Sequence, residues 1–451
     1  MTEITANNTF TAPEATKQLS VVVVMACIYI FLFIERPWES IRYLHGVPIE
    51  RLFAIAMIIV AFMHNKFRIV RSPTNKWVFS LLALQFILSP FAYNTGYAVD
   101  QGIEYAKMVI LYMLMLSVVD DEATLKVLVK AYVFTMMFYA LHSLLEYHNG
   151  RMMWRMGISR MMGVDETMGD PNAFAASIIL SLPMVYCLLR FETRRLMRRL
   201  YYCYYILAVI CVVLTGSRSA FVGMLLILSI WVAAQKGKRK LLMMVTAVLL
   251  CAVLWSVMPQ EKQERIRSLW DDDAGPANAH ESAEGRLEGF KVSCKMFKQR
   301  PFTGVGAGGK NFIGYRMTHN IDEEGHESPT QAHNLYGEVL AELGTGGVLL
   351  LLGYIISILR CSVVARGNLN SLGAKDTFQY SLGGAIITCV LILLFLGLGG
   401  HNFYRPMWLW LAAWSGTLFR ISGWNLQQVL NQTKLDEVNV FRRSDIKGKS
   451  A

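Results

Sequence analysis

The sequence predicts an all-α polytopic membrane protein with about 12 transmembrane helices. Three observations support this prediction: an apolar composition, twelve apolar segments, and basic residues that recur in alternate connections. Of the 451 residues, 54% are hydrophobic and only 17% are charged, and the mean hydropathy is positive. A chain of this composition is too apolar for a soluble domain and long enough for many spans.

The apolar segments define the predicted spans. A helix that crosses the hydrocarbon core needs about 20 mostly apolar residues. The cores of the twelve segments are residues 19–34, 51–63, 77–91, 104–119, 128–146, 172–189, 200–214, 220–234, 241–258, 336–359, 379–398 and 406–419. Because no repeat or linker divides the sequence, we expect one transmembrane domain over residues 1–451.

Basic residues set the predicted orientation. They fill alternate short connections near residues 66–76, 190–199 and 236–240, and they return in the tail after residue 434. The positive-inside rule makes this side cytoplasmic, and an even number of spans places both termini there. The net charge of +11 therefore reports topology, with attraction to anionic membrane lipid as a second effect. It does not argue for nucleic acid as a partner.

The outer side then carries two long connections, about 147–170 and 259–334. The second, between spans 9 and 10, has helical candidates at 261–270 and 281–297, and a segment with four glycines follows at 304–309. Such a glycine-rich segment favours irregular backbone. We expect this partly helical outer loop to carry part of an active site.

Three polar fragments reach this outer side. Arg218 lies in a tight turn between two spans, Arg286 lies in the long loop, and His333 opens the tenth span. One guanidinium group can donate two parallel hydrogen bonds to the oxygens of a phosphate. A neutral imidazole can accept a proton near neutral pH. Together they indicate chemistry on a phosphate-bearing lipid. The alternatives are an interfacial anchor for Arg218, a solvated helix face for Arg286 and a helix cap for His333.

The glycine-rich segment also resembles a phosphate-binding P-loop. Asn311, however, stands where a P-loop has the Ser or Thr that binds magnesium, so we do not expect nucleotide hydrolysis. Lys310 and Arg316 remain candidates for electrostatic attraction of a pyrophosphate or of acceptor phosphates.

Two glutamates in the tenth span and the cysteines are further candidates for a functional role. Glu338 and Glu342 lie on one face of the tenth span, where they either line an acceptor path or pair structurally. The eight cysteines have no metal-ligand spacing. We expect neither a metal nor a cofactor.

Five short motifs follow one another between residues 160 and 415. They are Gly169–Ala175, Thr215–Ala220, Gly285-Arg286 with Pro301–Gly306, His333–Tyr336 with Glu342–Gly344, and His401–Pro406. In order, spacing and outer location they resemble the O-antigen ligase and polymerase superfamily of bacterial inner-membrane glycan-assembly proteins, and most of all the O-antigen ligases.

The resemblance implies transfer of a glycan from undecaprenyl pyrophosphate to an acceptor hydroxyl in lipopolysaccharide assembly. The acceptor is the lipid A-core for a ligase and another glycan for a polymerase. The transfer would be metal-independent and inverting, at the periplasmic face, with catalytic His333, Arg218 and Arg286. The residues expected to bind donor or acceptor are Asn334, Lys310, Arg316, Arg405 and Glu338.

Two alternatives to ligation stay open. The first is a polymerase of lipid-linked repeat units, which would share the arginines and the histidine and differ in its acceptor. The second is a non-enzymatic transporter of lipid-linked oligosaccharide. A transporter should carry several basic residues inside its spans, whereas the candidates here cluster at the outer surface.

Overall fold

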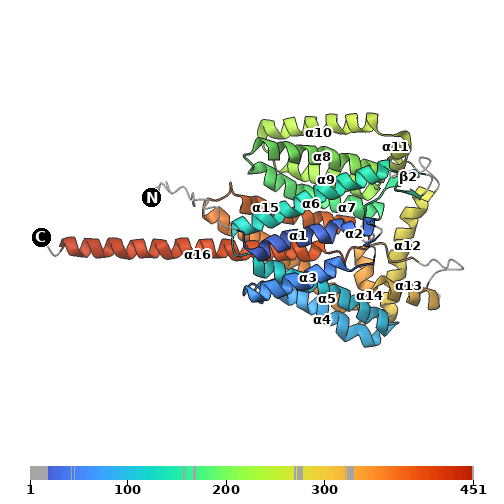
Figure 1. Cartoon of the computed structure of the whole chain (residues 1–451), viewed down its shortest axis with the longest axis horizontal. Coiled ribbons are helices and arrows are strands. Elements are labelled where there is room, and N and C mark those ends of the chain that lie inside the picture. Colours follow the sequence, from blue (N-terminus) through green and yellow to red (C-terminus); the bar gives the residue numbers. More distant parts are fainter. Residues whose placement is uncertain are drawn as a thin grey trace.

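The computed structural model describes residues 19–448 apart from 42, 45, 156–157, 166–168, 269–270, 272–277, 320 and 322–329. Most of its long helices run side by side in one bundle (Figure 1). A helix covers each predicted apolar segment. These helices are α1 (Val21–Glu35), α3 (Ile49–Met63), α4 (Asn75–Leu88), α5 (Thr95–Val118), α6 (Glu122–His148), α7 (Pro171–Arg190), α8 (Arg195–Thr215), α9 (Arg218–Ala233), α10 (Gly237–Val257), α14 (Leu335–Ser371), α15 (Phe378–Leu396) and α16 (Met407–Gly448).

Eight helices in the described part of the chain are long and apolar enough to cross a membrane. They are α1 with the short α2 (Pro37–Ser40), α5, α6, α7, α8, α10, α14 and α15. α9 is apolar but shorter, and α3 and α4 have only 15 and 14 residues. The structure confirms an all-α polytopic membrane protein. The count of twelve spans stays a prediction.

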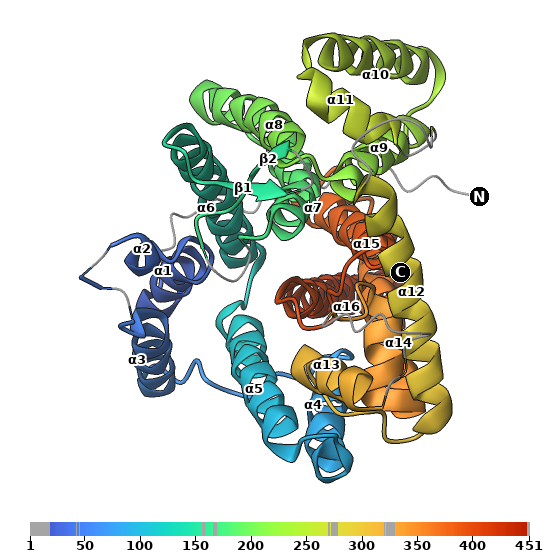
Figure 2. The same cartoon turned by 90° about the vertical axis from the view of Figure 1, so that its right-hand side faces the viewer.

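The elements of the predicted outer loops gather at one end of the bundle. α11 (Gln260–Arg267), α12 (Asn278–Gln299) and α13 (Gly309–Thr318) lie there, and the C-terminal half of α16 projects from the opposite end (Figure 1). α12 lies across this end beside α14 (Figure 2). α11 and α12 confirm the two helical candidates of the long loop.

Two elements at this end were not predicted. α13 follows the glycine-rich segment, and strands β1 (Met152–Arg155) and β2 (Ile158–Met161) form an antiparallel hairpin before α7. Neither strand, Met-Met-Trp-Arg or Ile-Ser-Arg-Met, shows the strict alternation of apolar and polar residues that reveals a strand in the sequence.

The glycine-rich segment docks on a kink in α14. The helix is interrupted at Gly344, where φ is 61° and ψ is −158°, so carbonyls of the preceding turn lose their partners within the helix. The N–H of Val305 donates to the carbonyl of Ala341 at 2.8 Å, and that of Gly306 donates to Glu342 at 3.1 Å. A Cβ atom at Gly304 would lie 2.3 Å from the Glu342 carbonyl oxygen. The glycines therefore permit a close backbone approach.

Candidate functional site

Arg218 is the first residue of α9 and is only 8% exposed. α8 ends at Gly216, whose φ of 60° is left-handed, and the Ser217 hydroxyl caps α9 by accepting from the Ala220 N–H. The Arg218 guanidinium leaves the helix toward the long loop, where Nη1 donates to Ser268 Oγ at 3.0 Å. The side chain is thus held inside the protein, which argues against a simple anchor at the lipid surface.

Two further arginines hold the turn that carries Arg218. Arg160 Nε, on β2, donates to the carbonyl of Thr215 at 2.7 Å, and Arg265 Nε, on α11, donates to that of Gly216 at 2.9 Å. Both arginines are buried. Sequence analysis missed them because each looks like an ordinary loop cation, and no motif marks either one.

Arg286 on α12 shares its electrostatic surroundings with Arg218. Its guanidinium lies against Gly399, where an added Cβ atom would be 3.0 Å from Nη1. Burial, and then the nearby charge of Arg218, lower the pKa of Arg286. Two cations brought together from separate segments create a positive potential that suits an anion.

His333 faces a second histidine that sequence analysis had placed only within a motif. The His333 and His401 ring centroids are 5.6 Å apart. His333 adopts a left-handed φ of 49°, an uncommon conformation for a residue with a side chain. The following Asn334 caps α14, because its Oδ1 accepts from the Gly337 N–H. The Asn334 side chain is therefore committed to starting the helix.

His401 is neutral near neutral pH. Burial lowers its pKa to about 4, with smaller contributions from His333 and Arg405. Its Nδ1 atom is buried and has no hydrogen-bond partner in the described part of the protein.

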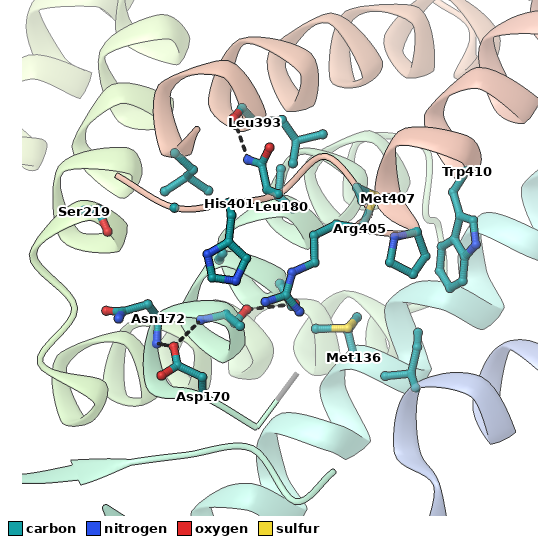
Figure 3. A pocket seen from close by; sticks show the side chains of 18 of the residues that line it. Met136, Asp170, Asn172, Leu180, Ser219, Leu393, His401, Arg405, Met407 and Trp410 are labelled. Carbon is teal, nitrogen blue, oxygen red and sulfur yellow. Dashed lines mark hydrogen bonds between the residues drawn. The ribbon is translucent and has the colours of Figure 1, made fainter. Parts of the chain in front are cut away.

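A cavity of about 200 Å³ lies between the start of α7 and the connection from α15 to α16. Figure 3 shows His401 and Arg405 facing Asp170 and Asn172, with Ser219 at one side. The polar residues that line this cavity are Asp170, Asn172, Ser177, Ser219, His333, His401, Asn402 and Arg405. Neither Arg218 nor Arg286 lines this cavity, but Ser219, the next residue after Arg218, does, and so does Gly399, against which the Arg286 guanidinium lies.

A larger cavity, of about 720 Å³, adjoins the first. The residues that line both are Phe33, His401, Arg405 and Pro406. Its other walls come from α1, α2, α3 and α5, from Gly309 and Gln331, and from Glu338 and Tyr404. Of the predicted binding residues, Arg405 lines both cavities and Glu338 lines this one.

Glu338 and Glu342 hold the connection that carries His401 and Arg405. Glu338 Oε2 accepts from the Phe403 N–H at 3.0 Å. Glu342 Oε2 accepts from the Tyr404 hydroxyl at 2.8 Å and from the Gly308 N–H at 2.7 Å. Both carboxylates are buried. Glu342 serves structure, whereas Glu338 combines a structural contact with a place in the cavity wall.

The structure separates the two remaining binding candidates from the cavities. Lys310 is exposed, with its Nζ 5.4 Å from the centre of the Tyr97 ring. Arg316 is buried, and it donates to Glu288 Oε1 at 2.7 Å and to Thr330 Oγ1 at 2.8 Å. Arg316 therefore ties α13 to α12. Neither side chain lines either cavity.

The described residues contain no group of three or more His, Cys, Asp or Glu side chains that could hold a metal ion.

Comparison with known proteins supports the resemblance seen in the motifs. Residues 203–352 match the family described as O-antigen ligase. This match covers about a third of the chain and includes Arg218, Arg286 and His333, while His401 and Arg405 follow it. A search of curated proteins finds no significant match.

Proposed function

We propose that this protein, whose residues 203–352 match the O-antigen ligase family, transfers a glycan from undecaprenyl pyrophosphate to an acceptor hydroxyl. We place the reaction at the periplasmic face of a bacterial inner membrane, with the lipid A-core as the favoured acceptor. The observation that supports this most is that residues of three separate segments meet at one end of the bundle: His333 lines the small cavity, Arg286 lies against Gly399 of its wall, and the charge of Arg218 is near Arg286.

The arginines suit the departure of a pyrophosphate. In an inverting transfer the acceptor oxygen attacks the anomeric carbon while the bond from that carbon to the phosphate oxygen breaks. The electron pair leaves with undecaprenyl pyrophosphate, so negative charge grows on its oxygens. Arg218 and Arg286 put two guanidinium groups in one positive region, where such charge is stabilised more in the transition state than in the bound donor.

His333 suits the role of general base. It accepts the proton of the acceptor hydroxyl as that oxygen attacks, and it becomes cationic while the leaving group becomes more anionic. His401, 5.6 Å away between ring centroids, is neutral near neutral pH because burial lowers its pKa to about 4. It therefore adds no charge that would oppose the arrival of a proton on His333.

Replacing Arg218 with lysine tests the role of the guanidinium group. The change keeps the charge and removes the planar fork, so we expect a loss of about 2–3 kcal/mol in transition-state stabilisation, or about 30- to 150-fold in rate. Transfer by the purified protein is the measurement. Arg267→Lys is a matched control, because Arg267 lies on α11 at the same end of the bundle and its guanidinium lies over the Trp255 ring. Normal turnover of Arg218→Lys would make Arg218 an anchor.

The glycolipids of a strain without this protein separate the three functions. A missing ligase leaves long polymer on the lipid carrier, and a missing polymerase leaves single repeat units. A missing transporter leaves the lipid-linked oligosaccharide on the cytoplasmic side, and this outcome would contradict the proposed transfer.

A further inference from the structure

We infer that the larger cavity is the acceptor subsite, that it takes an uncharged glycosyl unit, and that the N-terminal helices select this unit. The inference rests on the proposed function, because it identifies the chemical class of the acceptor in the same reaction. Four features of the larger cavity support the inference: its position, its size, the charge balance of its N-terminal wall, and its hydrogen-bonding groups.

The position of the cavity puts its contents next to the histidine pair. His401 and Arg405 form part of the wall that the two cavities share, and His333, which lines the smaller cavity, has its ring centroid 5.6 Å from that of His401. A hydroxyl presented at this shared wall is therefore close to the proposed base. Gly399, against which Arg286 lies, and Ser219, which follows Arg218 in the chain, line the smaller cavity and not the larger one.

The sizes of the two cavities fit an acceptor sugar in the larger cavity and the reacting groups in the smaller one. Small-molecule sites usually have volumes of about 300–1,000 Å³. The larger cavity, at about 720 Å³, falls in this range, whereas the smaller one, at about 200 Å³, has room mainly for the reacting groups.

The N-terminal wall of the larger cavity is balanced in charge. Its charged side chains are three basic and three acidic: Arg36, Arg51, Lys107, Glu39, Glu50 and Glu104. Three ion pairs join five of the six: Arg36 to Glu39 at 2.9 Å, Arg36 to Glu50 at 3.3 Å, and Lys107 to Glu104 at 2.5 Å. A wall whose charges sum to zero provides little net attraction for a phosphate, in contrast to the region around Arg218 and Arg286.

The hydrogen-bonding groups of the cavity match sugar hydroxyls. A hydroxyl donates and accepts hydrogen bonds, whereas an ionised phosphate accepts them and is repelled by carboxylates. The N-terminal wall offers carboxylate acceptors beside ammonium and guanidinium donors. Gln101 and Gln331 also line the cavity, and an amide both donates and accepts. Their side chains lie against Gly308 and Gly309 respectively, beside the segment that docks on α14.

Of these residues, Gln101 and the charged side chains of the N-terminal wall lie outside the region that matches the family. The match begins at residue 203, whereas α1, α2, α3 and α5 all precede it. The proposed charge-stabilising residues and the base are inside the match. The helices proposed to select the acceptor thus precede the match, and they meet the matched region at the larger cavity, where Gly309, Gln331 and Glu338 complete the wall.

The experiment compares two forms of one acceptor with the purified full-length protein in lipid nanodiscs. The probes are core oligosaccharide as isolated, with its phosphates, and the same oligosaccharide after chemical removal of phosphate. We expect wild-type protein to use the phosphate-free probe at least as well. Gln101→Leu should raise the KM for this probe about tenfold through lost hydrogen bonds, while kcat and the KM for donor stay within about twofold. Gln260→Leu on α11 is the control, because Gln260 lines neither of the two cavities.

Two charge variants test the balance of the wall. Glu104→Gln makes the wall more positive and Lys107→Gln makes it more negative. We expect the ratio of KM for the phosphorylated probe to KM for the phosphate-free probe to fall about threefold in the first and to rise about threefold in the second, because a nearby charge is partly screened by solvent. An unchanged ratio in both variants, or a strong wild-type preference for the phosphorylated probe, overturns the inference.

The failure of this inference is distinguishable from the failure of the proposed function. If Arg218→Lys slows transfer as expected while Gln101→Leu and the charge variants behave as wild type, the transfer function stands and the acceptor subsite is wrong. If wild-type protein transfers to neither probe, saturation-transfer NMR with the phosphate-free probe decides. Contacts that are present in wild type and absent in Gln101→Leu support a sugar site without ligase activity, and equal spectra overturn it.

Discussion

Adding one methyl group at Gly399 should move the Arg286 guanidinium without changing its charge, and so should test whether its position matters for catalysis. A Cβ atom at Gly399 would lie 3.0 Å from Arg286 Nη1 and 3.3 Å from Cζ. Ordinary contacts between such atoms are about 3.5 Å, so Gly399→Ala should displace the guanidinium by about 0.5 Å. A misplacement of 1 Å at a catalytic group can cost about 100-fold. Half of that displacement predicts a loss of about tenfold in kcat, or about 1.4 kcal/mol.

The neighbouring glycine provides the control. A Cβ atom at Gly400 would meet only the Leu396 carbonyl oxygen, at 3.5 Å, and Gly400 lines the same cavity. Gly400→Ala should therefore keep near-normal kcat, and both variants should keep wild-type thermal stability, because the arginine side chain can move aside. Transfer rates of the purified proteins at saturating donor are the assay. Equal losses in both variants would assign the effect to the connecting loop, and no loss in either would show that Arg286 is not positioned for catalysis.

Three further predictions concern protonation and topology. If His333 is the base, transfer falls as pH falls from about 9 to 5; full activity at pH 5 with a decline above pH 7 would show a cation that pairs with phosphate. Because burial lowers the pKa of His401 to about 4, below about 6.5 in the unfolded chain, the unfolded state binds a proton first. Stability should therefore be lost as pH falls from about 6.5 toward 4, and His401→Gln should flatten this loss in thermal unfolding. In a cysteine-free background, a cysteine at Phe302 should react with an impermeant thiol reagent in cells stripped of their outer membrane, and one at Gly237 should not; the reverse pattern would invert the topology.

Several parts of the fold could be predicted because their physical cause is local. Each of the twelve apolar segments carries a helix, since transfer of a helix into hydrocarbon depends on its own side chains and on its own backbone hydrogen bonds. α11 and α12 were visible for similar reasons, as charged helical stretches bounded by breakers. The hairpin β1–β2 was missed because neither strand alternates apolar and polar residues, so nothing local in the sequence marks it.

The residues of the candidate site could also be predicted only in part. The side chains able to hold pyrophosphate or to accept a proton, Arg218, Arg286 and His333, could be named from residue type, motif and predicted side of the membrane. Arg316 was named by the same reasoning, yet it ties α13 to Glu288 and Thr330. A cation in a polar loop looks the same in sequence whether its partner is a ligand or a carboxylate.

By itself, then, the sequence determined a helical membrane protein, the alternation of its basic connections and the chemical types available at its outer end. Only the tertiary structure decided that His401 faces His333, that Arg160 and Arg265 hold the Arg218 turn, and that a balanced cavity adjoins the histidine pair. The physical reason is the distance along the chain over which each property is determined. Hydropathy and helix formation sum over neighbours in the chain, whereas a cavity and its charges depend on distances between segments that meet only after the helices pack.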